Sequence, residues 1–497
     1  MVFHGVVVCG WLRYKMATLT KSKYFKGEQC QRLLWFANKK QLPEVSLFDQ
    51  HKFDQGPIFE EYVKKNYPEG VELGNLEFNE NIEQTQESVK RKKMIFEAGF
   101  KTDEFFVRAD ILEPNGDGWN LYEIKASSDE KKIKIYFPDL AFQKFVIEKT
   151  GLKVKNCFIL KLNKEYVKGG EIDPKELVEK HDVTEQVNLI TNVEENAQKY
   201  LETIKDENEA PIKISVNCNK PYPCPLKKHC WGTLPTNNVL HLTKWQQYWK
   251  FFHQGIIDMK DIPKEAMLTD KDKVISNAAV KQKIGVSKEH IKHFVKKLHY
   301  PLYHFDFETI DTAVPIYDKS RPYQKIPFQY SLHIEHEDGK LEHFEYLAEG
   351  DKDPRIKLLE QLKDEIKGTG SVVVFNKSFE NGVFKKLAID FPEHADWIQN
   401  VLDRIVDLAV PFQNFYYYNP VQKGSYSIKK VLPAITGKGY ENLEINNGGD
   451  ASAEYFNTFI KKKEKNEALR KNLLIYCGLD TEAMVWIVDE LKKLIGR

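Results

Sequence analysis

The segment from His304 to Thr309 carries two carboxylates, Asp306 and Glu308, within a run rich in aromatic residues. In a β-strand, side chains at positions i and i+2 leave from the same face, so we expect these two carboxylates to stand side by side. Their mutual repulsion is costly unless a cation lies between them. The pair therefore predicts the beginning of a metal site, and further ligands must come from elsewhere in the chain.

Two later segments offer such ligands. Glu380 lies in the first turn of an expected helix after the apolar strand 372–375, and Tyr476 and Asp480 are four residues apart on one face of another helix. Carboxylates suit Mg²⁺ or Mn²⁺, and a pair of these ions activates water and stabilises the leaving oxygen in displacement at phosphorus. The Tyr476 hydroxyl can orient the attacking water. The predicted chemistry is phosphodiester hydrolysis.

This order of motifs resembles the DEDD exonuclease superfamily, in the subclass whose last motif is Tyr-x-x-x-Asp. The resemblance implies a ribonuclease H-like sheet and hydrolysis in the 3′→5′ direction. The sequence departs from the superfamily at Glu380, where an aspartate is usual, and Asp407 is a secondary candidate acid. Taken alone, the pair Asp306 and Glu308 is more often a solvated strand edge, so the prediction depends on all three motifs together.

A second set of candidate residues lies in the first half of the chain. Asp110 ends an expected strand, 105–112, and Glu123 and Lys125 project from one side of the next strand, 119–125. The set resembles the PD-(D/E)XK nucleases, in which two carboxylates hold Mg²⁺ and the lysine stabilises the hydrolytic water and the developing charge. The alternative for Glu-x-Lys alone is a surface ion pair.

Two further residues extend this resemblance to the RecB-like nucleases. Gln143 lies on the expected helix 139–149, which follows the Glu-x-Lys motif. Glu60 ends the segment Gly56–Glu60, where those enzymes carry an acid or a histidine, and Glu61 is the alternative to Glu60.

Four cysteines bracket this second set. Cys218, Cys224 and Cys230 are spaced C-x5-C-x5-C, and Cys30 lies far upstream. Four thiolates can hold a 4Fe-4S cluster or a tetrahedral Zn²⁺, and gaps wider than those of a zinc knuckle favour the cluster. The arrangement resembles the iron–sulfur RecB-like nucleases, which often show C-x2-C-x5-C, so Cys218 departs from their pattern. Such a cluster would be structural.

From Lys21 onward, the chain resembles a bacterial family of largely unassigned function that joins a RecB-like nuclease to a DEDD-type exonuclease. We therefore expect an α/β protein in four parts. These are an N-terminal extension (1–20), a RecB-like PD-(D/E)XK nuclease domain with an iron–sulfur cluster (21–236), a helical connector (237–298) and a ribonuclease H-like DEDD exonuclease domain (299–497).

The segment Gly424–Pro433 is a candidate for contact with nucleic acid. Ser425 lies in a turn that enters a helix, and Lys429 and Lys430 follow in the first turn of that helix. Backbone N–H groups and lysines placed in this way can bind a phosphate. The alternative is an ordinary capped helix.

The composition is that of a globular protein without a strong overall electric field. The 497 residues are 41% hydrophobic and carry a formal charge of +1, so any contact with nucleic acid must come from local patches. Seven unevenly placed cysteines indicate a reducing cytoplasm. No segment approaches the length of a membrane span, so we expect no membrane partner.

The sequence thus predicts a nuclease that depends on Mg²⁺ or Mn²⁺ and has two active sites. DNA is favoured over RNA as the substrate, with a role in repair or in defence against foreign DNA. Two alternatives stay open: an RNA-processing exonuclease, and a nucleic-acid-binding scaffold with one decayed nuclease site.

Overall fold

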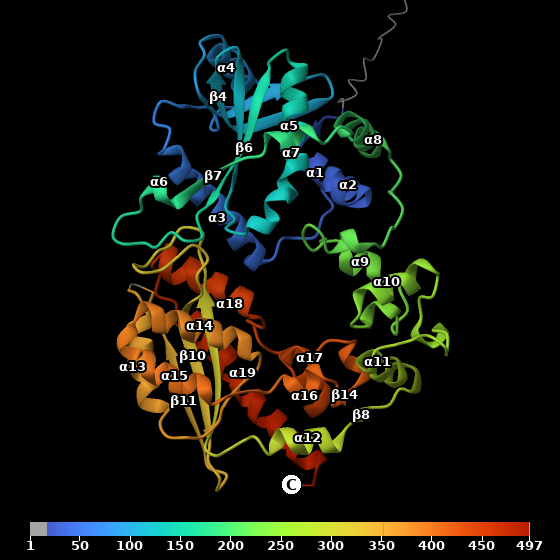
Figure 1. Cartoon of the computed structure of the whole chain (residues 1–497), viewed down its shortest axis with the longest axis vertical. Helices are drawn as coiled ribbons and strands as arrows, with labels where there is room; N and C mark the ends of the chain where they lie inside the picture. The colour runs from blue at the N-terminus through green and yellow to red at the C-terminus, as the bar shows by residue number, and fades with distance from the viewer. Residues whose placement is uncertain (1–16, 351, 497) are drawn as a thin grey trace, which may run out of the picture. The chain divides into compact units, whose positions relative to one another are not determined.

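The computed structural model describes residues 17–350 and 352–496 (Figure 1). The chain is a mixed α/β protein, which confirms the expected fold class. It forms two compact units. The first unit contains the described residues up to Glu44 together with 58–164 and 173–231, and the second contains 45–57, 165–172 and the described residues from Gly232 onward.

These units differ from the four expected parts in three respects. The region 237–298 belongs to the second unit, and two short segments from the first half of the chain, 45–57 and 165–172, also belong to it. Residues 1–16 of the expected N-terminal extension lie outside the described residues, but its end, Leu19–Thr20, forms β1 and pairs with a strand of the first unit. Among the described residues, every helix is too short or too polar to cross a lipid bilayer.

The first unit is built on a seven-stranded sheet in the order β2-β3-β4-β5-β6-β7, with β1 paired to β4. The strands are β2 (Val71–Glu72), β3 (Ile95–Lys101), β4 (Phe105–Asn115), β5 (Gly118–Lys125), β6 (Val154–Leu162) and β7 (Val178–Asp182). β4 and β5 lie at the strands expected from the sequence, 105–112 and 119–125, whereas β3 and β7 were missed. Asp110 does not end its strand, because the β4–β5 pairing continues to Asn115 and Gly118.

Two helices of the first unit carry residues that matter below. α1 (Lys21–Gln29) begins where β1 ends, and α5 (Phe137–Lys149) follows β5 in the sequence. Tyr24 of α1 stacks on Phe142 of α5, with ring centroids 4.3 Å apart, and both side chains are buried. This contact fixes the start of α1 against the core of the unit.

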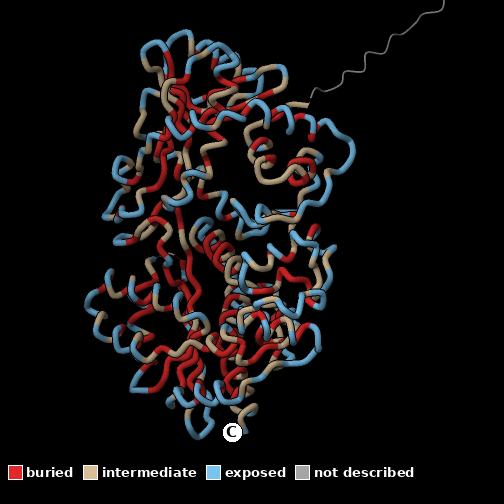
Figure 2. Tube along the Cα trace, turned by 45° about the vertical axis from the view of Figure 1, so that its right-hand side comes forward, coloured by how far each residue is buried: buried red, intermediate tan, exposed pale blue. Residues whose placement is uncertain are grey.

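The second unit is built on a five-stranded sheet in the order β11-β10-β9-β12-β13. The strands are β9 (Leu302–Ile310), β10 (Ile326–Glu335), β11 (Leu341–Leu347), β12 (Val372–Val374) and β13 (Ile405–Asp407). The central strand β9 runs antiparallel to β10 and parallel to β12. β9, β10 and β12 are largely buried, whereas most residues of the edge strand β11 are exposed or half-buried (Figure 2).

Helices cover both faces of this sheet. On one face, Phe305 and Phe307 of β9 pack against Phe384 of α14 (Lys377–Asp390). On the other face, the side chains of Asp306 and Glu308 point toward the long helix α19 (Glu467–Leu494), which contacts both β9 and β10. The alternation of the strand therefore separates an apolar face from a face that carries the carboxylates.

The region expected to be a helical connector is indeed mainly helical. It contains α10 (Trp245–His253), α11 (Asp270–Lys281) and α12 (Lys288–Val295). It also contains a short strand that was not predicted, β8 (Gly285–Val286), which pairs with β14 (Tyr417–Tyr418). This pairing and the packing of Ile291 and Phe294 in the core tie the region to the second unit.

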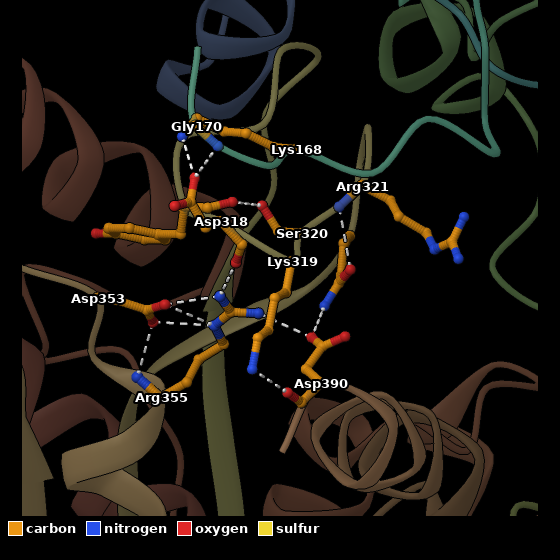
Figure 3. A network of polar contacts seen from close by, with 11 residues as sticks. Lys168, Gly170, Asp318, Lys319, Ser320, Arg321, Asp353, Arg355 and Asp390 are labelled. Carbon is orange, nitrogen blue, oxygen red and sulfur yellow. Dashed lines mark hydrogen bonds and ion pairs between the residues drawn. The ribbon is translucent and has the colours of Figure 1, made fainter. Parts of the chain in front are cut away.

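A buried arginine organises a loop cluster in the second unit (Figure 3). Arg355 begins α13 (Arg355–Glu365), and its guanidinium donates to Asp390 at 2.8 Å, to Asp353 at 2.9 Å and to the backbone oxygen of Asp318 at 2.6 Å. The Asp318 carboxylate in turn accepts hydrogen bonds from the Lys168 ammonium and the Gly170 backbone N–H. Through these contacts the segment 165–172 is held to the second unit.

We expect Arg355→Met to destabilise the protein by about 3–5 kcal/mol, because it leaves the buried Asp390 carboxylate without its counter-charge. Lys357→Met, on the exposed side of the same helix, should change the free energy of unfolding by less than about 0.5 kcal/mol. Urea denaturation monitored by tryptophan fluorescence measures both. Equal destabilisation by the two substitutions would contradict the structural role of Arg355.

Candidate active sites

Three carboxylates converge in the second unit. One ligand oxygen from each of Asp306, Glu308 and Asp480 lies within 4.8 Å of the other two. The first two residues come from the central strand β9 and the third from α19, so the site lies where this helix crosses the sheet. The predicted partnership of the β9 pair with Asp480 is thus present in the structure.

Burial and mutual repulsion raise the pKa values of these acids. Burial, together with the charges of Asp480 and Glu308, raises the pKa of Asp306 well above its ordinary value. Burial and the charge of Asp480 raise the pKa of Glu308 to about 8. The pKa of Asp480 rises only to about 6, since hydrogen bonds from Tyr440 and Tyr476 and the Lys429 charge oppose the effect of burial. Asp480 is therefore the acid that ionises most readily.

A helix terminus approaches the site closely. α18 (Gly448–Tyr455) begins beside β9, and a side-chain carbon added at Gly448 would lie 3.1 Å from Glu308 Oε2. A larger residue here would require the Glu308 carboxylate to shift by a few tenths of an ångström. The first turn of α18 thus lines the site from the side of Glu308.

Two tyrosines contact the carboxylates, and only one of them was predicted. Tyr476 is buried beside Asp480 and donates a hydrogen bond to it, as its position four residues earlier on α19 implies. Tyr440 donates its hydroxyl to Asp480 Oδ1 at 2.5 Å. Burial and the Asp480 charge raise the pKa of both hydroxyls, so both stay protonated. Tyr440 was missed because 40 residues of sequence separate it from Asp480 and no local spacing links them.

Glu380 lies beside the three carboxylates but outside their closest group. It occupies the first turn of α14, as predicted, and its charge adds to the raised pKa of Asp306. The turn before α14 is made by Asn376, whose φ of 98° lies in the left-handed region that asparagine tolerates. Glu380 is nearly fully buried, and its Oε2 has no hydrogen-bond partner in the described structure. Burial raises the pKa of Glu380 to about 8.

The secondary candidate Asp407 has a structural role. Its Oδ1 accepts hydrogen bonds from the backbone N–H groups of Asn376 at 3.1 Å and Ala409 at 2.9 Å. It therefore stabilises the turn that places Glu380, and it influences the site through the Coulomb effect of its charge on Glu380.

The predicted phosphate-binding residues divide into two groups. Lys429, on α17 (Ile428–Thr436), lies over the rings of Tyr440 and Tyr476, and the charges of Asp480 and Glu308 act on its ammonium. This places Lys429 beside the carboxylates. Lys430 and Ser425 form the second group. Lys430 is exposed, and the Ser425 hydroxyl lies 3.3 Å from the Ser427 hydroxyl.

A second group of charged residues lies in the first unit. Asp110 of β4 and Glu123 of β5 are held side by side, and the Ile124 backbone N–H donates to Asp110 Oδ2 at 2.7 Å. The ammonium of Lys21, which was not predicted, lies 3.1 Å from Asp110 Oδ1 and 3.1 and 3.2 Å from the two oxygens of Glu123. Glu123 is completely buried.

Lys125 and Gln143, two of the candidate residues chosen from the sequence, contact Glu123. Lys125 forms an ion pair with Glu123 Oε1, and Gln143 donates to Glu123 Oε2 at 2.6 Å. Burial raises the pKa of Glu123, but the charges of Lys125 and Lys21 outweigh this effect and lower it to about 2. Asp139 lies 3.6 Å from Lys125 and was missed, although it precedes Gln143 by four residues on the same helix face.

Glu97, a second residue that the sequence did not predict, lies between Glu60 and this group and interacts electrostatically with Glu60 and Asp110. Glu97 falls opposite Asp110 in the β3–β4 ladder, between the pairs Phe96–Ile111 and Ala98–Ala109, and its φ is 56°. Burial and the charges of Asp110 and Glu60 raise the pKa of Glu97 to about 7, so the three acids lie close together. Glu60 also pairs with Lys64 at 2.7 Å, whereas Glu61 is exposed.

The four candidate cluster ligands line one pocket of the first unit. These are Cys30, Cys218, Cys224 and Cys230. None of them forms a disulfide among the described residues. Burial raises the pKa of Cys224 to about 11, and the other three sulfur atoms add to this effect. A site that gathers four thiols in this way suits a metal that binds thiolates.

Comparison with known proteins gives relatives without a described activity. Residues 303–427 match a family model described as a domain of unknown function, DUF2779. This range holds Asp306, Glu308 and Glu380, and Asp480 lies beyond it.

Curated relatives are found in Mycoplasma and Ureaplasma species. The chain is 31% identical over 218 residues to the uncharacterized protein MG366 of Mycoplasma genitalium, covering 39% of this chain and 32% of the relative. It is 29% identical over 218 residues to the uncharacterized protein UU173 of Ureaplasma parvum, with 39% and 31% coverage. The chain thus spans about a third of the length of the curated relatives it matches.

The raised pKa of Glu308 predicts how the metal-free protein responds to pH. The unfolded carboxyl titrates near 4.5 and the folded one near 8, so the folded form holds its proton more tightly. The stability from this group is fully present below about pH 4.5 and is lost as the pH rises toward 8. In EDTA, Glu308→Gln should therefore stabilise the protein more at pH 8 than at pH 5.5, measured by thermal unfolding. Glu337→Gln, an exposed control, should show no such difference.

The Tyr440 hydroxyl orients Asp480, so we expect Tyr440→Phe to weaken Mn²⁺ binding at this site by about 10–100-fold. Isothermal titration calorimetry in a Glu123→Gln background measures binding at the Asp480 site alone. Tyr455→Phe is the matched control, because the buried Tyr455 hydroxyl has no hydrogen-bond partner in the described structure. Equal affinities in the two variants would show that Tyr440 does not support the site.

Proposed function

We propose that this protein is a metal-dependent nuclease with two active sites, one in each compact unit. The observation that carries the proposal is the convergence of Asp306, Glu308 and Asp480 within 4.8 Å of one another in a buried place. When ionised, three carboxylates held this close repel one another strongly unless a cation joins them.

The second unit offers a fitting site for Mg²⁺ or Mn²⁺. Asp306, Glu308 and Asp480 would hold the ion, and Glu380 would complete the set, since its buried Oε2 has no other partner in the described structure. When bound, such ions activate water and stabilise the leaving oxygen of a phosphodiester. Tyr476 positions the attacking water, and Lys429 places a positive charge on the approaching phosphate. The five-stranded sheet with β9 at its centre agrees with the ribonuclease H-like fold that the resemblance implies.

The surroundings of these acids fit a nucleic-acid strand. The three carboxylates line a pocket together with Phe375, Phe379 and Ile428. The aromatic rings of the two phenylalanines therefore lie next to the carboxylates. Aromatic faces stack on bases, while the metal ligands act on the backbone. We favour a single strand entering from its 3′ end, and DNA rather than RNA as the polymer.

The first unit would supply the second active site, of the PD-(D/E)XK type. Asp110 and Glu123 would hold Mg²⁺ or Mn²⁺, and Lys125 would stabilise the charge that develops on the phosphate. Gln143 orients Glu123 through a hydrogen bond. The four cysteines would hold a 4Fe-4S cluster, with Zn²⁺ as the alternative, and would join Cys30 of the chain start to the segment 218–230.

Hydrolysis of end-labelled DNA and RNA, single- and double-stranded, by the full chain with Mn²⁺ tests the proposal. Asp306→Asn should lower 3′→5′ degradation by at least about 100-fold, because it removes a direct metal ligand. Lys125→Ala should lower the remaining activity, which is assigned to the first unit. Glu337→Gln and Lys132→Ala, both exposed, are the matched controls. If the wild type leaves every substrate intact, or if Asp306→Asn and Lys125→Ala degrade them as the wild type does, the proposal fails.

A further inference from the structure

The side chain of Lys21 occupies the space between the two acids of the first unit. Its ammonium nitrogen lies 3.1 Å from Asp110 and 3.1 Å from the nearer oxygen of Glu123. No motif in the sequence points to this residue, which precedes Asp110 by 89 positions. The position that a divalent cation would take between these carboxylates is therefore filled by a cation of the chain itself.

The backbone of Lys21 is held firmly in place. The two residues before it form β1 and pair with Phe105 and Phe106 of β4, the strand that carries Asp110. Thr20 caps α1 by accepting a hydrogen bond from the Lys23 backbone N–H. Because the start of α1 is fixed on both sides, only the flexible stem of Lys21 can move its ammonium in or out of the site.

The charges around Asp110 and Glu123 indicate which lysine side chain is displaced when a divalent cation binds. Lys21 and Lys125 already place two positive charges beside the carboxylates of Asp110, Glu123 and Asp139, so a divalent cation would add two more positive charges in the same small space. Lys125 has a further anchor in Asp139, 3.6 Å away. The ion pairs of Lys21 in the described structure involve only the two acids that would bind the metal.

We propose that Lys21 is an internal competitor of the metal: its ammonium occupies the first site in the metal-free protein and withdraws when a divalent cation binds. The inference rests on the proposed function, because it takes Asp110 and Glu123 as metal ligands. If the ammonium occupies the site in about 90% of the molecules, the apparent metal affinity is about tenfold lower than that of an open site. Lys21 would then set the metal concentration at which the first unit becomes active.

Direct Mn²⁺ binding tests this role without relying on activity. The test uses the full chain with Asp306→Asn and Asp480→Asn, which remove two metal ligands of the second site. Calorimetry and electron paramagnetic resonance then measure Mn²⁺ binding at the first site. Lys21→Met should tighten Mn²⁺ binding by about tenfold or more. Lys23→Met is the matched control on the same helix, since the Lys23 ammonium donates to the Thr18 backbone oxygen and forms no ion pair with a carboxylate among the described residues. Unchanged or weaker binding in Lys21→Met would overturn the proposal.

Thermal unfolding gives a second readout. In EDTA, Lys21→Met should melt at a lower temperature than its parent, because two acids lose a counter-charge, and Mn²⁺ should restore the melting temperature. Lys21→Gln provides the same comparison with a milder change, because its amide can still donate to one carboxylate. A melting temperature that does not respond to Mn²⁺ in either variant would count against the competition.

Two further variants separate this inference from the proposed function. Asp110→Asn and Glu123→Gln should each abolish Mn²⁺ binding at the first site. If they leave binding unchanged, the metal assignment itself fails. If they abolish binding but neither Lys21 variant tightens it, only the role of Lys21 fails.

Discussion

Both candidate sites depend on one constraint, which is that the fold gathers carboxylates in places where little water can screen them. Repulsion between like charges grows as the local dielectric constant falls. The protein reduces this repulsion in two ways. In the second unit the acids have raised pKa values, about 8 for Glu308 and about 6 for Asp480. In the first unit two lysines neutralise Glu123, whose pKa falls to about 2, whereas burial and the charge of Glu123 raise the pKa of Asp110.

The surrounding structure serves to hold these charges in place. In the second unit, the apolar face of β9 packs through Phe305 and Phe307 onto α14, and this packing fixes the strand whose other face carries the acids. The long helix α19 is anchored along its length by buried residues such as Leu473, Ile487 and Leu491, so Asp480 meets β9 at a set position. A well-packed core resists the relaxation by which the carboxylates would otherwise separate.

The sequence predicted those parts of the sites that lie close together in the chain. The pairs Asp306/Glu308 and Glu123/Lys125 follow from the period of a strand, and Tyr476/Asp480 follows from the period of a helix. Lys21, Glu97 and Tyr440 could not be found in this way, because each reaches its site from a distant segment through tertiary contacts. Glu97 was further hidden because its strand, β3, was missed. Only Asp139 had a local signal, in its spacing from Gln143.

The two solutions to the same repulsion have different consequences for a metal. Where protons neutralise the acids, a cation must displace those protons, so its binding depends on pH around the raised pKa values. Where lysines neutralise a carboxylate, as at Glu123, that group has no proton to lose, and the cation competes with an ammonium whose charge is constant over the same pH range. The acids of the two units are thus alike in type, but the side chains that balance their charge differ. It follows that the units need not bind metal under the same conditions, even though both use Asp and Glu oxygens as ligands.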